Sequence, residues 1–227
     1  MFKVAIFDLD GTLLNTIDDL ANACNYALSK FSFPTHESEK YKTFIGNGLY
    51  KLVERALPLE YRDNETINMV LDVFNKYYNE HMMDMTRPYN GVMDLLDHLI
   101  DEGIGLAVVS NKKHDFTLEI IHKYFCDRFK IVLGLRENYK AKPDPTSLLE
   151  VINELGVNYA CLGDFETAIK YFKKGFEASK DVEICTNIVM CYLNLGDKEN
   201  AKLHLDIAKK LNSEDDVVVE LDRILAK

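Results

Sequence analysis

The stretch Val4-Ala5-Ile6-Phe7-Asp8-Leu9-Asp10-Gly11-Thr12 decides the fold of this 227-residue chain. Its first four residues are apolar and predict a buried strand of a parallel sheet. Residues two apart on a strand point to the same side, so the carboxylates of Asp8 and Asp10 would lie together at the carboxyl end of this strand. Such a pair can hold a divalent metal ion, attack phosphorus with one acid and move a proton with the other.

Strand and helix patterns alternate after this stretch. We expect strands over residues 3–9, 104–109 and 130–133. We expect helices over residues 91–102, 116–125 and 146–155. This alternation predicts an α/β fold with a parallel sheet. Residues 17–83 have a helical pattern throughout, apart from a break at 46–48, and they follow the first strand directly. We therefore expect them to form a helical cap inserted into the α/β core.

The C-terminal part of the chain contains a repeat. The pattern Tyr159…Leu162-Gly163-Asp164…Ala168…Phe172 returns 33 residues later as Tyr192…Leu195-Gly196-Asp197…Ala201…Leu205. A fixed period near this value is typical of stacked helical hairpins. Small residues where helices cross, large residues one turn later and a Gly-Asp turn form a physically sensible unit. A last helix, over about 216–226, would cap the stack.

The composition excludes several classes of partner. The chain has 37 acidic and 27 basic residues, a net charge of -10, so neither nucleic acid nor an anionic membrane surface is expected as its main partner. No apolar run approaches the length of a membrane span. A strand begins almost at once, so we expect no signal peptide. Five scattered cysteines without CxxC spacing favour a reduced, cytoplasmic protein without structural zinc.

Residues 1–157 carry a series of short motifs in a fixed order. They are Asp8-Leu9-Asp10-Gly11-Thr12-Leu13, Phe44-Ile45-Gly46-Asn47-Gly48-Leu49, Arg87-Pro88-Tyr89-Asn90-Gly91, Val108-Val109-Ser110-Asn111-Lys112 and Lys142-Pro143-Asp144-Pro145. This set resembles the haloacid dehalogenase superfamily of phosphatases, and within it the phosphoglycolate phosphatase-like group with a helical cap. Several motifs in the right order are far more specific than one alone.

The resemblance implies catalytic roles for three of these residues. Asp8 would attack phosphorus and become an aspartyl phosphate, while Asp10 would protonate the leaving alkoxide and then activate water. Lys142 would counter the charge that builds up in the transition state. The neighbouring Lys112 could be an ordinary surface charge, whereas the adjacent Pro143 singles out Lys142. Mg²⁺ is the implied cofactor, with Asp8 and Asp10 among its ligands.

The resemblance also implies a phosphate cradle and a substrate loop. Ser110 would act with the catalytic residues by donating a hydrogen bond to a phosphate oxygen, helped by Asn111. Free backbone N–H groups around Gly11 and Thr12 would complete the cradle. The cap would close over the site, exclude water and present Gly46-Asn47-Gly48 to a small phosphorylated metabolite. The alternative for these glycines is a simple helix break.

The chain departs from the family at its fourth motif, a strand ending in Gly-Asp with another acid a few residues on. The one candidate is Cys161-Leu162-Gly163-Asp164, which follows no apolar strand, and Ala168 stands where the second acid would fall. Asp164 is a candidate metal ligand, but the helical repeat accounts for it better. In the family the fourth strand lies beside the first, so its loss would leave the first strand as an exposed edge.

The segment over about 149–227 resembles tetratricopeptide repeats. We therefore expect a truncated Rossmann-like core over 1–16 and 86–157, a cap over 17–85 and repeats over 158–227, the first of which could borrow helix 146–155. The leading interpretation is a cytoplasmic phosphatase for a phosphoglycolate-like monoester. The alternative is a catalytically impaired domain that serves as a scaffold, with a peptide or protein bound at the repeats.

Overall fold

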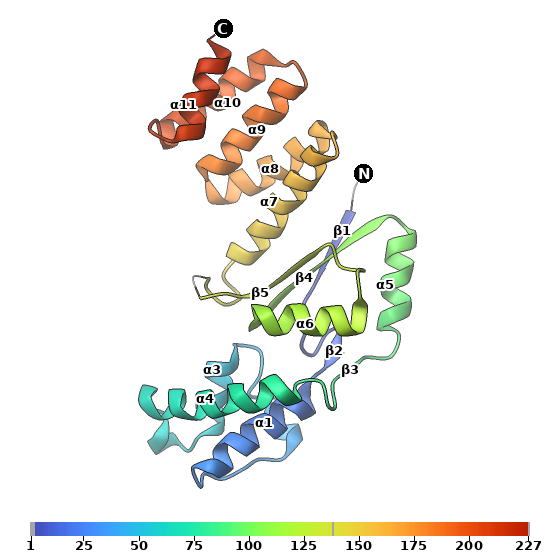
Figure 1. The fold of residues 1–227 in the computed structure, drawn as a ribbon, viewed down its shortest axis with the longest axis vertical. Helices are drawn as coiled ribbons and strands as arrows, with labels where there is room; N and C mark the ends of the chain where they lie inside the picture. Colours follow the sequence, from blue (N-terminus) through green and yellow to red (C-terminus); the bar gives the residue numbers. More distant parts are fainter. Residues whose placement is uncertain (1–2, 138, 227) are drawn as a thin grey trace. The chain divides into compact units, whose positions relative to one another are not determined.

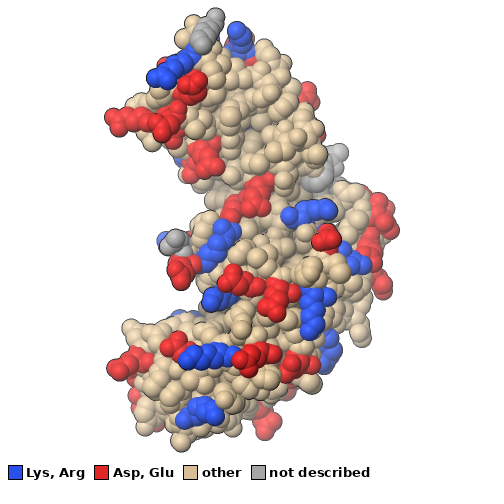
Figure 2. Space-filling model, in the orientation of Figure 1, with Lys and Arg blue, Asp and Glu red and all other residues tan. Residues whose placement is uncertain are grey.

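The computed structural model describes residues 3–137 and 139–226 (Figure 1). The chain divides into two compact units, Met1–Asp144 and Pro145–Lys227, which are described separately below. Among the described residues, no helix combines the length and the apolar character needed to cross a bilayer. On the face visible in Figure 2, acidic and basic side chains are interspersed.

The first unit contains a parallel sheet of three strands, β1 (Lys3–Phe7), β4 (Ile104–Lys113) and β5 (Ile131–Leu135), in the order β1-β4-β5. β4 continues beyond the predicted end at residue 109, because its pairing with β5 resumes at Lys113 after a shift in register. In the part of the chain that the structure describes, β1 is an edge strand, and Ile6 is 38% exposed. This agrees with the expected loss of the fourth strand.

Two helices flank β4 in the chain. They are α5 (Val92–Asp101), which precedes β4, and α6 (His114–Phe125), which joins β4 to β5. Leu96 of α5 and Ile120 of α6 are both fully buried in the same apolar cluster as Leu106 and Val108 of β4. The helices thus cover the sheet with apolar side chains. Because β1 and β4 pair in parallel, with Phe7 opposite Val108, their carboxyl ends meet at one edge.

The cap, residues 17–85, is less continuous than the sequence predicted. It contains α1 (Ile17–Lys30), α2 (Ser38–Tyr41), α3 (Leu49–Ala56), a short 3-10 helix (Leu59–Tyr61) and α4 (Asn64–His81). The breaks have local causes, since Pro34 and Pro58 cannot continue a helix and Gly48 has a φ of 84°. α1 and α4 pack together around buried side chains that include Phe74 and Tyr78.

The two connections between core and cap pair with each other, which the sequence did not predict. β2 (Leu14–Asn15) and β3 (Arg87–Pro88) form an antiparallel ladder. The carboxylate of Asp19, 2% exposed, accepts hydrogen bonds from the backbone N–H groups of Met85 and Thr86. These bonds tie the start of α1 to the returning chain. Strands of two residues have no periodicity that a sequence pattern could reveal.

The second unit consists entirely of helices within the described residues: α7 (Thr146–Cys161), α8 (Phe165–Ser179), α9 (Val182–Asn194), α10 (Lys198–Leu211) and α11 (Asp216–Leu225). Consecutive helices pack against each other. The repeated positions behave alike: Ala168 and Ala201 are fully buried, and Asp164 and Asp197 each accept a hydrogen bond from a backbone N–H in the first turn of α8 or α10. The helical-hairpin prediction is therefore confirmed.

Gly156 is needed where α7 packs against α8. A Cβ atom at this position would lie 2.6 Å from a ring carbon of Phe172, which is 1% exposed and has little room to move. We expect Gly156→Ala to lower the free energy of unfolding of this unit by about 1–2 kcal/mol, because overpacking outweighs the gain in helix propensity. Urea unfolding of the full chain, with hydrogen exchange of the α7 and α8 amides, measures the change.

Gly175 in α8 provides a matched control with the opposite expected sign. A Cβ atom there would meet its nearest neighbour at 3.4 Å, an ordinary contact. Gly175→Ala should therefore leave stability unchanged or raise it by up to about 1 kcal/mol through helix propensity alone. A Gly156→Ala chain as stable as Gly175→Ala would contradict the tight packing of these two helices.

Candidate active site

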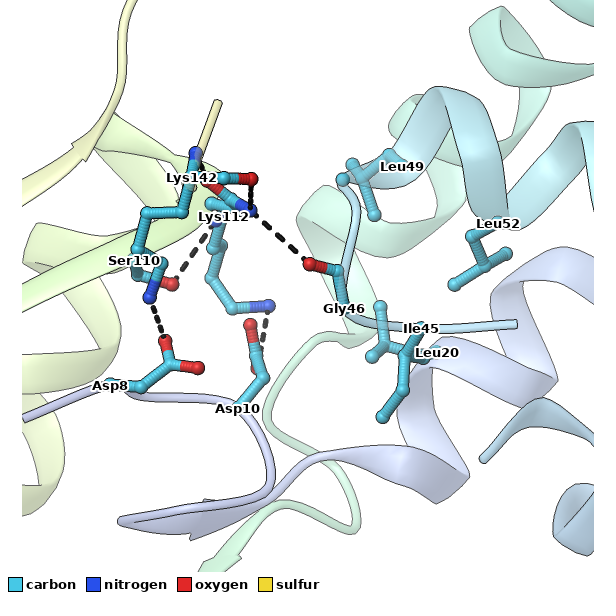
Figure 3. A pocket seen from close by; sticks show the side chains of 12 residues that line it. Asp8, Asp10, Leu20, Ile45, Gly46, Leu49, Leu52, Ser110, Lys112 and Lys142 are labelled. Carbon is cyan, nitrogen blue, oxygen red and sulfur yellow. Dashed lines mark hydrogen bonds and ion pairs between the residues drawn. The ribbon is translucent and has the colours of Figure 1, made fainter. Parts of the chain in front are cut away.

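Residues from both ends of the first unit's sequence line a small pocket at the carboxyl edge of the sheet (Figure 3). The pocket has a volume of about 70 Å³. Its core side is lined by Asp8, Asp10, Ser110, Asn111, Lys112 and Lys142, and its cap side by Leu20, Ile45, Gly46, Gly48, Leu49 and Leu52. The structure thus brings together seven of the residues that the sequence singled out, among them all four expected catalytic residues.

Lys142 lies directly beside Asp8. Its Nζ is 2.7 Å from Asp8 Oδ1 and donates a second hydrogen bond, also 2.7 Å long, to the carbonyl oxygen of Val109. The backbone N–H of Leu9 donates to the same Asp8 oxygen at 2.8 Å. Oδ2 is then the oxygen that Figure 3 shows turned towards Asp10. This arrangement places a cation beside a carboxylate and leaves one oxygen facing the pocket.

Asn111 holds the segment that carries Lys142. Its Oδ1 accepts from the backbone N–H of Lys142 at 2.7 Å, and its Nδ2 donates to the carbonyl oxygen of Lys142 at 3.3 Å. The same Nδ2 lies 3.2 Å from the carbonyl oxygen of Gly46 in the cap. Asn111 therefore links three chain segments around the pocket, a structural role beyond the phosphate contact that the family resemblance implies.

Asp10 is bound by a lysine that the sequence analysis did not include in the site. Lys112 Nζ is 3.1 Å from Asp10 Oδ1 and donates to the hydroxyl of Tyr78 at 2.6 Å. The hydroxyl of Thr16 also donates to Asp10 Oδ1, at 2.7 Å. Lys112 is 4% exposed, so it is not the surface charge that the sequence allowed. Its position two residues after the buried Ser110, on the same side of β4, was a usable signal.

Electrostatics keep Lys112 charged and Tyr78 neutral. Burial by itself lowers the pKa of Lys112, but the Asp10 carboxylate and the Tyr78 hydroxyl more than offset this effect, and the pKa lies above its ordinary value. Burial raises the pKa of Tyr78 to about 12, although the adjacent ammonium opposes the shift. Each of the two aspartate side chains of the site thus has its own lysine partner, Lys112 for Asp10 and Lys142 for Asp8.

The loop after β1 and the Ser110 hydroxyl complete the core side. The N–H groups of Gly11 and Thr12 donate to the carbonyl oxygens of Leu14 and Leu9, and neither residue lines the pocket. The backbone N–H groups of Gly11 and Thr12, which were expected to be free to bind a phosphate, are thus already hydrogen-bonded within the tight turn. Ser110 is 5% exposed, and its Oγ accepts from the N–H of Lys112 at 3.1 Å. Its own hydroxyl proton can be donated to an anion in the pocket.

The cap contributes glycines and an apolar wall. Gly46 and Gly48 line the pocket with φ values of 105° and 84°, which favour glycine. Asn47 is not among the lining residues. Its Oδ1 accepts a hydrogen bond from Arg55 Nη2 at 2.8 Å, and Arg55 Nη1 donates to the carbonyl oxygen of Phe44. Asn47 thus helps to hold the loop, and its contact with substrate stays a prediction.

The donor set suits a weakly held Mg²⁺ ion. Among the described residues, no group of three or more histidine, cysteine, aspartate or glutamate side chains could hold a metal ion. Mg²⁺ is commonly bound by one or two carboxylates together with water and substrate phosphate, which Asp8 and Asp10 can satisfy. Asp164 belongs to the second unit, where its carboxylate accepts from the N–H of Thr167 at the start of α8. Its role as a metal ligand stays a prediction.

Comparisons with known proteins agree with this geometry. Residues 5–162 match the family model described as haloacid dehalogenase-like hydrolase, and residues 149–181 and 182–215 match a tetratricopeptide repeat model. A phosphoglycolate phosphatase of Thiobacillus denitrificans is 34% identical over 159 residues, covering 68% of this chain and 70% of that protein. One from Haemophilus influenzae is 35% identical over 162 residues, covering 68% and 72%. The crystal structure of a predicted phosphoglycolate phosphatase from Haemophilus somnus is 30% identical with a TM-score of 0.62, covering 68% and 72%.

Proposed function

The chain belongs to the haloacid dehalogenase-like hydrolases, and from this premise we propose that it is a phosphatase acting on a small phosphomonoester of the phosphoglycolate type. The observation that supports this most strongly is the ion pair between Lys142 Nζ and Asp8 Oδ1, 2.7 Å long, in a pocket that also contains Asp10 and Ser110. A nucleophile, a cation beside it, a proton carrier and a hydroxyl donor are the parts that phosphoryl transfer needs.

The proposed reaction has two steps. Asp8 Oδ2 attacks phosphorus, the bond from phosphorus to the alcohol oxygen breaks, and the protonated Asp10 carboxyl group donates its proton to that oxygen. Asp10 then takes a proton from a water molecule, whose oxygen attacks phosphorus, so that phosphate leaves and the Asp8 carboxylate is restored. Lys142 and the Ser110 hydroxyl stabilise negative charge on the phosphoryl oxygens in both steps. A bound Mg²⁺ would supply further charge neutralisation at these oxygens.

Release of inorganic phosphate from an aryl phosphate and from phosphoglycolate, with and without Mg²⁺, tests this proposal directly. We expect Mg²⁺-dependent turnover of both. A folded, pure protein that releases no phosphate from either substrate, or from a panel of small alkyl phosphates, would overturn the phosphatase proposal.

The affinity for Mg²⁺ provides a sharper prediction. Among the described residues, no third acidic side chain joins Asp8 and Asp10 in a metal-binding group, so we expect half-maximal activity at Mg²⁺ concentrations on the order of 1 mM. Excess chelator should abolish the activity, and added Mg²⁺ should restore it. Titration of activity against Mg²⁺ measures this. Half-saturation in the low micromolar range would contradict it, because such affinity needs more protein ligands.

Asp164→Asn is the matched variant for this titration. Asparagine preserves the hydrogen bond that starts α8, because it caps helices as well as aspartate does, but it removes the negative charge. If Asp8 and Asp10 suffice, Asp164→Asn has the same Mg²⁺ dependence as the unmodified chain. A clear rise in the concentration needed would instead assign Asp164 to the metal site.

A binding role for the repeats is the second proposed function, favoured by the match of residues 149–181 and 182–215 to tetratricopeptide repeats. If the chain has no phosphatase activity, the α/β unit would serve as a scaffold, and a peptide or protein bound at α7–α11 would be the ligand. The proposed compartment is the cytoplasm, which agrees with five cysteines that are all free.

A further inference from the structure

The ammonium of Lys112 lies at the junction of the core and the cap. The Lys112 side chain is 1% exposed, and its two polar partners come from different parts of the chain: Asp10 follows β1 of the core, and Tyr78 belongs to α4 of the cap. The ammonium also lies 4.8 Å from the centre of the Tyr78 ring. Burying a charge is costly unless it is paired and hydrogen-bonded, so this lysine depends on both partners.

Tyr78 is held rigidly by the cap. It is fully buried, its ring stacks on Phe74 at 5.3 Å between centres, and its edge meets Phe116 of α6 at 5.6 Å. The position of its hydroxyl is therefore set by how α4 lies against the core. Because that hydroxyl accepts from Lys112 at 2.6 Å, a displacement of α4 removes one of the two partners that the buried ammonium needs.

Asp10 is the residue whose orientation these contacts decide. Lys112 and Thr16 both bind Oδ1 of its carboxylate, so the other oxygen is the one available to the pocket. Thr16 is 2% exposed and directly precedes α1 of the cap. Both groups that orient the carboxylate thus have a direct link to the cap.

We propose that Lys112 and Tyr78 are positioning residues that make the orientation of Asp10 depend on the seating of cap helix α4 against the core. Asp10 is then aligned for proton transfer when the cap is closed over the substrate, and misaligned when it is open. The proposal rests on the proposed phosphatase function. It predicts a loss in kcat with little change in KM when the Tyr78 hydroxyl is removed, because Tyr78 is not among the residues that line the pocket.

Tyr78→Phe tests the link with the smallest possible change. The ring and its packing remain, and only the hydroxyl is lost. We expect kcat for an alkyl phosphate to fall about tenfold, as for loss of a hydrogen bond to a charged group, with KM changed less than about twofold. Tyr77→Phe is the control on the same helix, because Tyr77 is not among the residues that line the pocket and its ring stacks on Tyr26 and His81. Its kcat should be unchanged.

A double-mutant cycle shows whether the two residues act as one unit. Lys112→Met keeps an unbranched side chain that is one atom shorter and removes its charge, and we expect kcat to fall about 100-fold or more. Adding Tyr78→Phe to Lys112→Met should cause no further loss, because the hydroxyl acts on Asp10 through the ammonium. If the losses in kcat of the two single variants were additive in the double variant, the proposal that Tyr78 acts on Asp10 through Lys112 would be wrong.

Hydrogen exchange separates the failure of this proposal from the failure of the phosphatase proposal. In the unliganded chain, the amides of Gly11, Thr12, Leu13 and Leu14 are hydrogen-bonded within the loop that carries Asp10. We expect Tyr78→Phe to accelerate their exchange, whereas Tyr77→Phe does not. If the unmodified chain had no phosphatase activity but exchange were faster in Tyr78→Phe and not in Tyr77→Phe, the phosphatase proposal would be wrong. The proposed coupling of Lys112 and Tyr78 to Asp10 would still hold. Equal exchange and equal kcat in the two tyrosine variants would overturn the link.

Discussion

Phosphate release by the Asp8→Asn variant is expected to fall by at least about 10³-fold, to the background of the assay. Asparagine has nearly the same size as aspartate, and its Oδ1 can still accept hydrogen bonds from Lys142 and from the N–H of Leu9. The packing around β1 should therefore survive, while the amide group cannot attack phosphorus. Steady-state release of phosphate from an aryl phosphate at saturating Mg²⁺ measures the loss.

Two controls make the Asp8 result specific. Asp94→Asn makes the same chemical change at an exposed position in the first turn of α5 and should leave activity unchanged. Rapid acid quenching of the unmodified chain during turnover, followed by peptide mass spectrometry, should find the phosphoryl group on the peptide that contains Asp8. If Asp8→Asn retained more than a small fraction of activity, or the label were found on another peptide, Asp8 would not be the nucleophile.

The Asp10→Asn variant is expected to lose about 10²- to 10⁴-fold in kcat with an alkyl phosphate, the range typical of a lost general acid and base. Its response to the leaving group is more informative than this loss alone. A nitrophenolate group leaves without a proton, so the first step with nitrophenyl phosphate should remain comparatively fast. The second step still needs a base to activate water, and it should become slow.

Pre-steady-state kinetics distinguish these two effects. With nitrophenyl phosphate, Asp10→Asn should release a burst of nitrophenol about equal to the enzyme concentration, with little phosphate released, because the phosphorylated Asp8 accumulates. The natural chain should show matched release of the two products. Equal losses for alkyl and nitrophenyl substrates, without a burst, would indicate that Asp10 does not transfer the proton in either step.

Much of the fold was accessible from the sequence because it is written in local patterns. The apolar run before Asp8 predicted β1, and the alternation after residue 91 predicted α5, β4, α6 and β5 in the correct order. The period of 33 residues predicted the hairpins of the second unit, including the equivalent caps at Asp164 and Asp197. Each of these signals depends on residues close in sequence or on a fixed spacing, so no tertiary information was needed.

The sequence did not show which polar groups near the site are already hydrogen-bonded within their own loops. The Oδ1 atom of Asn47 accepts a hydrogen bond from Arg55 in the cap loop, a contact that no motif indicates. The amides of Gly11 and Thr12 had been expected to be free, but the turn after β1 uses them. A motif identifies which residue types a site needs, yet it does not say whether a given polar group is already satisfied by its own chain.

By itself, the sequence determined the order of the elements, the presence of a hydrolase domain followed by helical repeats, and the placement of Asp8, Asp10 and Ser110 at one sheet edge. That placement follows because parallel strands bring their carboxyl ends together. Only the tertiary structure decided that Lys112 is buried between Asp10 and Tyr78, which are 68 residues apart in the chain. A lysine looks the same in a sequence whether water or a carboxylate surrounds it, and only packing removes the water.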